Sequence, residues 1–132
     1  MTRGRTLVKT RYAQTDFDVT SRRSLVSLRA ALVKHGLVEV NSFRRGSLWC
    51  AGFEGPRPHD TSEQCVRAIL DVLDGLDATT RALLRACSKR DVDIAFDVGR
   101  DDRFTSGLSR ATIKRLAHHD VGVRVTLYRA VP

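Results

Sequence analysis

Five aspartates fall within the twelve residues "DVDIAFDVGRDD" (91–102) of a chain whose formal net charge is +8. Carboxylate oxygens are the ligands that hard cations prefer, and carboxyl groups also act as acids and bases in hydrolysis. The stretch therefore raises two alternatives, a metal or catalytic site and the solvated side of a strand. The aspartates are Asp91, Asp93, Asp97, Asp101 and Asp102.

The alternation of apolar residues and aspartates favours the second alternative, the solvated side of a strand. In a strand over 92–98 the apolar residues would face one way and the aspartates the other. Neighbours on one face of a strand lie about 6.5–7 Å apart, so only Asp91 and Asp93 could approach one ion unaided. The loop that follows lacks the spacing of a calcium-binding hand. We expect pairing with Arg124 on the last strand and with Lys9 or Arg11 on the first, and no metal or cofactor.

Other residues with reactive groups have simpler explanations. His118 and His119 fall at the end of a predicted helix, where they would point about 100° apart and chelate poorly. Ser109 lies in "SGLSRA", which follows a polar loop rather than a strand, so a helix cap explains it better than a nucleophile. A hydrolytic pair of carboxylates remains open, although no pair stands out. The cysteines Cys50, Cys65 and Cys87 lack metal-ligand spacing.

The positive charge is concentrated at the start of the chain. Residues 1–50 carry ten basic and three acidic side chains, a net +7, against +1 for residues 51–132. With Phe43 and Trp49 nearby, such a surface resembles the basic and aromatic grooves that hold single-stranded nucleic acid. The aspartates would repel phosphate, however, and no nucleic-acid-binding motif occurs. The candidate residues are Arg22, Arg23, Arg29, Arg44 and Arg45.

Hydrophobic periodicity predicts the elements that carry these residues. A helix over 21–36 has Leu25, Leu28 and Leu32 on one face, widened by Val26 and Val33. A capping box from Thr61 to Gln64 opens a helix that ends at Gly75, and the next helix turns Leu83, Leu84 and Cys87 inward. Ser109 caps a short helix. The predicted strands are 6–13, 37–43, 47–53, 92–98 and 121–130, the second and third joined by a hairpin at Gly46.

The order β-α-β-β-α-α-β-α-β predicts one α+β domain over residues 1–132. It has a mixed sheet of about five strands, with a ferredoxin-like core and one extra αβ unit. The longest apolar runs are a few residues long, so we expect no membrane span. The first ten residues lack the apolar core of a secretory signal, and we therefore expect a cytoplasmic protein.

Residues 45–130 resemble a family of small bacterial α+β proteins known as a domain of unknown function. The resemblance rests on "RRGSLWCAGFE", "LLRACSKRDVDIAFDVG" and "GLSRATIKRLAHHDVGVRVTLY". It implies a strand, a helical pair, a strand, a short helix and a last strand. The family brings no active site, so no residue takes a role from it. Some such families look like immunity proteins paired with bacterial toxins.

The function that these observations favour is a non-catalytic protein-binding module of immunity or regulatory type. Its partner would contact the acidic patch of the five aspartates or the basic patch of the five arginines. Surfaces of opposite sign steer association and are also compatible with self-association. The alternative is nucleic-acid binding through the basic patch.

Overall fold

Strand β1 (Arg11–Ser21) lies at the centre of the sheet, and its side chains alternate between two environments. Thr15, Phe17, Val19 and Ser21 are buried, whereas the residues between them are partly exposed. This period of two places an apolar stripe on one face of the strand and polar side chains on the other. The computed structural model describes residues 8–129.

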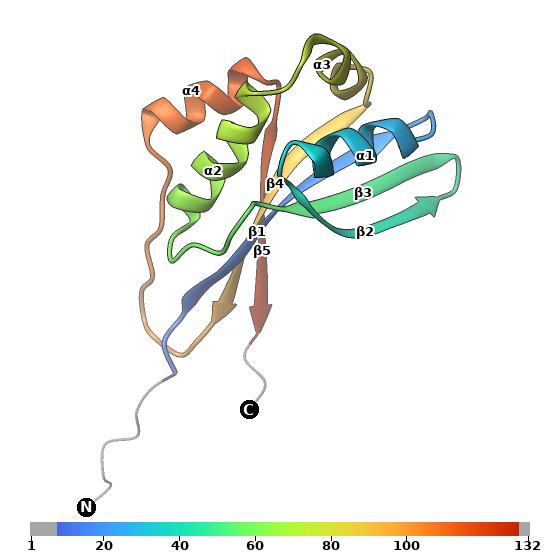
Figure 1. The fold of residues 1–132 in the computed structure, drawn as a ribbon. Helices are drawn as coiled ribbons and strands as arrows, with labels where there is room; N and C mark the ends of the chain where they lie inside the picture. The colour runs from blue at the N-terminus through green and yellow to red at the C-terminus, as the bar shows by residue number, and fades with distance from the viewer. Residues whose placement is uncertain (1–7, 130–132) are drawn as a thin grey trace, which may run out of the picture.

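The strands form one mixed sheet in the order β2-β3-β1-β4-β5. All neighbouring strands are antiparallel except the last pair, which is parallel. The helices cover one face, as Figure 1 shows. The elements after β1 are α1 (Val26–Lys34), β2 (Val38–Arg45), β3 (Leu48–Glu54), α2 (Ser62–Asp74), α3 (Ala78–Arg85), β4 (Lys89–Val98), α4 (Arg110–His118) and β5 (Gly122–Arg129).

This topology confirms the predicted α+β fold and its element order. Strands β1 and β2 flank β3 and are joined through α1, which is the split β-α-β arrangement of a ferredoxin-like core. The unit β4-α4-β5 adds the parallel strand at the edge. No helix within residues 8–129 is long and apolar enough to cross a membrane.

The core fills the space between the helices and one face of the sheet. Fully buried side chains come from both layers. Burying one large apolar side chain contributes about 1.5–3 kcal/mol relative to leaving it exposed, so this layer dominates the stability. Its largest members are Phe17, Phe53, Leu32, Leu37, Ile69, Leu70 and Leu73.

The first strand and the first helix were placed too early by the sequence pattern. Residues 6 and 7 of the predicted strand lie outside the described residues, and β1 continues to Ser21. Helix α1 begins only at Val26, so Arg22 and Arg23 lie in the connecting loop rather than on the helix. The reason is that "TDFDVTS" alternates with period two and forms strand.

Three predicted core positions are also wrong. Val26 and Val33 on α1 are 65% and 49% exposed, because this short helix buries only Leu28 and Leu32. Leu83 on α3 is exposed as well. The caps are confirmed: the side chains of Thr61 and Ser109 each accept a hydrogen bond from the first turn of their helices.

Candidate functional site

The uncovered face of the sheet brings carboxylates from three strands side by side. In one row, Glu54 on β3 lies opposite Asp16 on β1, which lies opposite Asp93 on β4. Directly opposed side chains in a sheet have Cβ atoms about 4.5–5.5 Å apart. In the next row Asp18 lies opposite Asp91. We call Asp16, Asp18, Glu54, Asp91 and Asp93 the open-face carboxylates.

Two glycines make room for the second row. A Cβ at Gly52 would lie 2.8 Å from Oδ1 of Asp18 and 2.9 Å from Oδ1 of Asn41. A Cβ at Gly122 would lie 2.5 Å from Oδ1 of Asp91. Both approaches are closer than carbon and oxygen atoms tolerate. The carboxylates of Asp18 and Asp91 therefore lean sideways over neighbouring strands that carry no side chain there.

The half of the site next to β5 is neutralised by partners on β5 and on β4 itself. Arg124 donates to Asp91 at 2.9 Å and also lies 3.9 Å from Asp93. Lys89 lies 3.5 Å from Asp91, and the hydroxyl of Thr126 donates to Asp93 at 2.7 Å. These contacts confirm the predicted pairing between the aspartates of β4 and Arg124.

The other half of the site has no such partner. Among residues 8–129, no Lys, Arg or His nitrogen lies within 4.0 Å of the carboxylates of Asp16, Asp18 or Glu54. Oδ1 of Asp16 is buried and lacks a hydrogen-bond partner. Like charges placed directly opposite each other destabilise a sheet. The arrangement therefore costs folding free energy.

The crowding of these carboxyl groups also affects their pKa values. Burial, reinforced by the nearby charges of Asp18, Glu54 and Asp93, raises the pKa of Asp16 from 3.8 to about 6. Burial and the charge of Asp93 also raise the pKa of Asp18, and Arg124 opposes this shift only in part. Two adjacent carboxyl groups thus hold their protons more tightly than usual.

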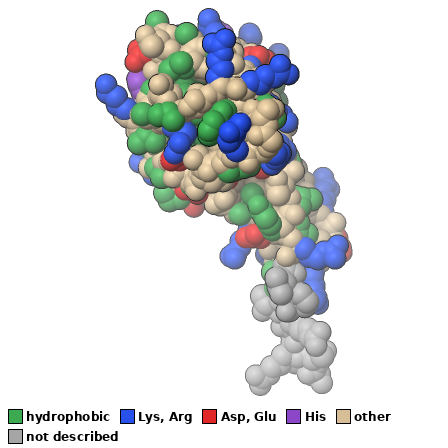
Figure 2. All heavy atoms as spheres, turned by 90° about the vertical axis from the view of Figure 1, so that its right-hand side faces the viewer, with side chains coloured by type: hydrophobic (Ala, Val, Ile, Leu, Met, Phe, Trp, Pro, Cys, Tyr) green, Lys and Arg blue, Asp and Glu red, His purple; other side chains and the backbone are tan. Residues whose placement is uncertain are grey.

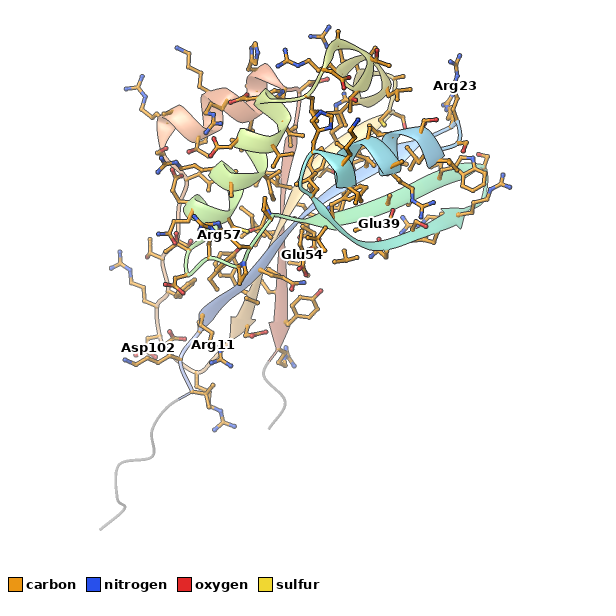
Figure 3. All side chains as sticks on the ribbon, in the orientation of Figure 1. Arg11, Arg23, Glu39, Glu54, Arg57 and Asp102 are labelled. Atoms are coloured by element: carbon orange, nitrogen blue, oxygen red, sulfur yellow. The ribbon has the colours of Figure 1, made fainter. Side chains whose placement is uncertain are left out.

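The remaining predicted aspartates lie toward the other end of the sheet, with Asp97 on the same face of β4 and Asp101 and Asp102 in the loop after it. Asp97 is near Arg11, at 3.9 Å, and Asp101 accepts hydrogen bonds from the backbone N–H and the hydroxyl of Thr10. Asp102 is exposed in the loop after β4. Figure 3 shows Arg11 and Asp102 at the end of the sheet remote from Arg23. The predicted acidic patch is therefore divided, and only Asp91 and Asp93 belong to the open-face carboxylates.

Asp16, Asp18 and Glu54 were missed by the sequence reasoning. Their signal was present, because "TDFDVT" (15–20) repeats the alternation of "DVDIAFDV". The strand boundary at residue 13 hid it. Once both segments are strands of one sheet, antiparallel pairing of their polar faces brings the carboxylates together.

The predicted basic patch is also divided. Arg29 is paired with Glu39 through two hydrogen bonds, so its charge is compensated. Arg44 lies over the ring of Trp49 and Arg45 over Phe43, at 4.5 and 5.7 Å from the ring centroids. Alternation along β2 sends these two arginines to opposite faces of the sheet.

Basic and apolar side chains nevertheless gather on the side of the molecule shown in Figure 2, with few acidic ones. Arg22 and Arg23 are exposed in the loop before α1. The guanidinium groups stacked on Trp49 and Phe43 occupy the positions that bases would need for stacking on these rings. This surface has the charge of a nucleic-acid interface without its free aromatic platform.

His118, His119 and Cys87 have structural surroundings. Nε2 of His119 lies 2.6 Å from Asp74, which also accepts a hydrogen bond from Arg115. The rings of His118 and His119 are arranged edge to face rather than converging on a point. Burial raises the pKa of the Cys87 thiol, which disfavours the reactive thiolate. Within residues 8–129 no group of three or more His, Cys, Asp or Glu side chains could hold a metal ion.

The open-face carboxylates are thus the arrangement that structure alone explains least well. Two of the five are compensated by Arg124, Lys89 and Thr126, and the other three have no ion-pair partner among residues 8–129. No family model, no curated protein and no solved structure matches this chain.

Proposed function

We propose that the protein is a non-catalytic binding module that uses the open face of its sheet to cover a basic surface of a partner protein. The observation that carries the proposal is the uncompensated group of Asp16, Asp18 and Glu54. Their mutual repulsion lowers stability, so folding alone gives no reason for their grouping. Strongly perturbed carboxyl groups gathered on one surface are typical of functional sites.

A cationic partner would remove that cost. Arginine or lysine side chains placed above the two rows would form charge-assisted hydrogen bonds with carboxylates that have few partners of their own. Phe43 and Tyr128 flank the acidic centre from β2 and β5, and they are 45% and 56% exposed. Exposed aromatic side chains around a polar centre suit a protein interface, in which aromatic residues are enriched.

The sign of the charge decides against phosphate as the ligand of this face. A nucleic acid would bring its phosphates against five carboxylates, whose basic neighbours within 4.0 Å among residues 8–129 are Arg124 and Lys89. A partner that itself binds phosphate, by contrast, presents a basic surface complementary to these rows. Covering that surface would block its substrate, which supports an immunity or regulatory role.

Nucleic-acid binding remains the second candidate because Arg22, Arg23, Arg44 and Arg45 gather near one end of the sheet. The two candidates place the binding site on different surfaces. They therefore predict opposite outcomes for charge changes at the open face and at the basic end.

The test is affinity capture from the lysate of the source cell, with and without nuclease. The variants are Asp16→Asn with Asp18→Asn, and Arg44→Glu with Arg45→Glu. The proposal predicts one stoichiometric protein that survives nuclease, is lost with the first variant and is retained with the second. Recovery of nucleic acid that is lost only with the arginine variant would overturn it.

A matched control removes the same charge from another place. Asp60→Asn with Asp102→Asn changes two exposed aspartates that lie in loops outside the open face. We expect this variant to capture the partner as the unchanged protein does. An equal loss in the control would mean that overall charge, rather than the open face, determines binding.

A further inference from the structure

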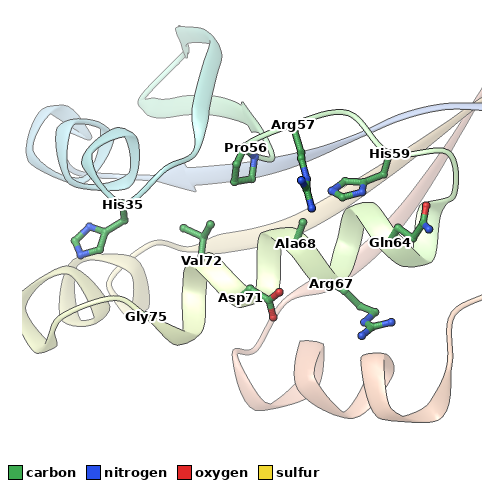
Figure 4. A pocket seen from close by; sticks show the side chains of 10 residues that line it. All are labelled: His35, Pro56, Arg57, His59, Gln64, Arg67, Ala68, Asp71, Val72 and Gly75. Atoms are coloured by element: carbon green, nitrogen blue, oxygen red, sulfur yellow. The ribbon is translucent and has the colours of Figure 1, made fainter.

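A second site lies on the helical side of the molecule, away from the open-face carboxylates. A groove of about 620 Å³ runs between α2 and the loop after β3, with the end of α1 closing one side. This volume is within the range of small-molecule sites. Its floor is formed by Ala68 and Val72 of α2, and Pro56 lies above them (Figure 4).

One end of this groove is basic. In Figure 4, Arg57 and His59 extend from the loop toward α2 and Gln64 lies on the first turns of that helix, whereas the Arg67 side chain extends from the other side of α2 toward α4. Within residues 8–129, neither Arg57 nor Arg67 has a carboxylate within 4.0 Å. The acid of the groove, Asp71, is bound by Arg115 at 2.8 Å. The guanidinium of Arg57 is therefore left without an ion-pair partner at this distance, whereas the charge of Arg67 helps to lower the pKa of Glu63 on the preceding turn.

His59 adds an independent observation. Its Nε2 atom is buried and has no hydrogen-bond partner. His59 lines both the groove and a second cavity of about 350 Å³, which is also lined by Arg57, Tyr12 and Cys65 among others. A buried polar atom without a partner requires an explanation, and a bound ligand or water is the usual one. His35 differs, because its Nδ1 lies 2.8 Å from the carbonyl oxygen of Ala31.

We propose that this groove binds a small organic phosphate, with the phosphate at the end formed by Arg57, His59 and Gln64 and the apolar part along Ala68 and Val72. The guanidinium fork of Arg57, an imidazole and an amide offer donors to more oxygens than the two of a carboxylate. A phosphate monoester provides three terminal oxygens and about two negative charges. The basic end also lies near the N-terminus of α2, where the helix dipole favours an anion.

The experiment is a titration of the whole protein with phenyl phosphate, inorganic phosphate and benzoate, followed by two-dimensional ¹H–¹⁵N NMR at fixed low salt. We expect phenyl phosphate to shift the amide signals of Gln64, Arg67 and Ala68 and to bind at least tenfold more tightly than benzoate. Inorganic phosphate should shift the same amide signals but bind with lower affinity, because it lacks the apolar part. Equal affinity for benzoate would overturn the assignment to phosphate.

Two double variants distinguish a specific phosphate site from the general attraction of anions to a basic protein. Arg57→Gln with Arg67→Gln should weaken phenyl phosphate binding at least tenfold. Arg110→Gln with Lys114→Gln removes the same charge from another surface groove, on α4, and should leave the affinity unchanged. Shifts spread over the whole surface, or an equal loss in both variants, would contradict the proposal. Unchanged unfolding curves for both variants would show that the fold is intact.

Discussion

The two faces of the sheet are built from the same strands and have opposite energetics. On β1, Phe17 is completely buried under the helices, whereas its neighbours Asp16 and Asp18 lie among like charges on the other face. The helix-covered face gains free energy from every apolar side chain that it buries. The open face loses free energy by grouping carboxylates. The first face is explained by folding, and the second calls for a partner.

The largest expected effect is on the covered face. Phe17→Ala should lower the free energy of unfolding by about 3–5 kcal/mol, because it removes a fully buried ring and leaves a cavity. Urea unfolding followed by circular dichroism measures this change. A loss below about 1 kcal/mol would mean that the helices do not pack on β1 as described.

The adjacent residue should respond in the opposite direction. Asp16→Asn should raise the free energy of unfolding at pH 7 by about 1 kcal/mol, because it removes a charge that burial and three carboxylates disfavour. The full shift in pKa corresponds to at most about 3 kcal/mol, and solvent screening on this face reduces it. The same urea titration applies. Destabilisation by this substitution would contradict the view that the acidic centre is costly.

A pH series sharpens this prediction. Because the pKa of Asp16 is raised to about 6 in the folded state, the folded protein binds this proton more tightly than the unfolded chain does. Protonated Asp16 makes its full contribution to stability below about pH 4, and this contribution is lost as the pH rises through 6. The difference in unfolding free energy between Asp16→Asn and the unchanged protein should therefore be near zero at pH 4 and reach about 1 kcal/mol by pH 7. A difference in unfolding free energy that stays constant from pH 4 to pH 7 would contradict the raised pKa of Asp16.

The smallest effect is expected at the edge of the covered face. Val125 lies opposite Ile94 on the same side of the sheet, yet it is 56% exposed because β5 extends beyond the helices. Val125→Thr should change the free energy of unfolding by less than about 0.5 kcal/mol. Ile94, by contrast, is buried, and Ile94→Thr should cost several times more. Equal losses at both positions would show that β5 is covered.

Much of the fold followed from local patterns in the sequence. The capping hydroxyls of Thr61 and Ser109, the turn at Gly46 and the alternation of β4 each act over a few residues, and these predictions are confirmed. The wrong predictions concern positions whose burial depends on packing between elements that are distant in the sequence. Val26 and Leu83 have the spacing of core residues but lie on helix faces that the described elements leave exposed.

The candidate site was harder to predict because it depends on register. Asp91 and Asp93 are visible in the pattern of one strand, but their effect depends on Asp16 and Asp18 being opposite them. Register is fixed by the pairing of whole strands, and local composition does not specify it. The same holds for the basic patch, since only the structure shows that Arg29 is paired with Glu39.

The most direct test of the binding face measures stability and partner capture on one variant, Asp16→Asn with Asp18→Asn. We predict that this protein unfolds at higher urea concentration than the unchanged protein and captures its partner at least tenfold less well. That combination would mean that the carboxylates are kept for binding at the expense of stability. Undiminished capture by a correctly folded variant would contradict the account, because the partner would then contact another surface.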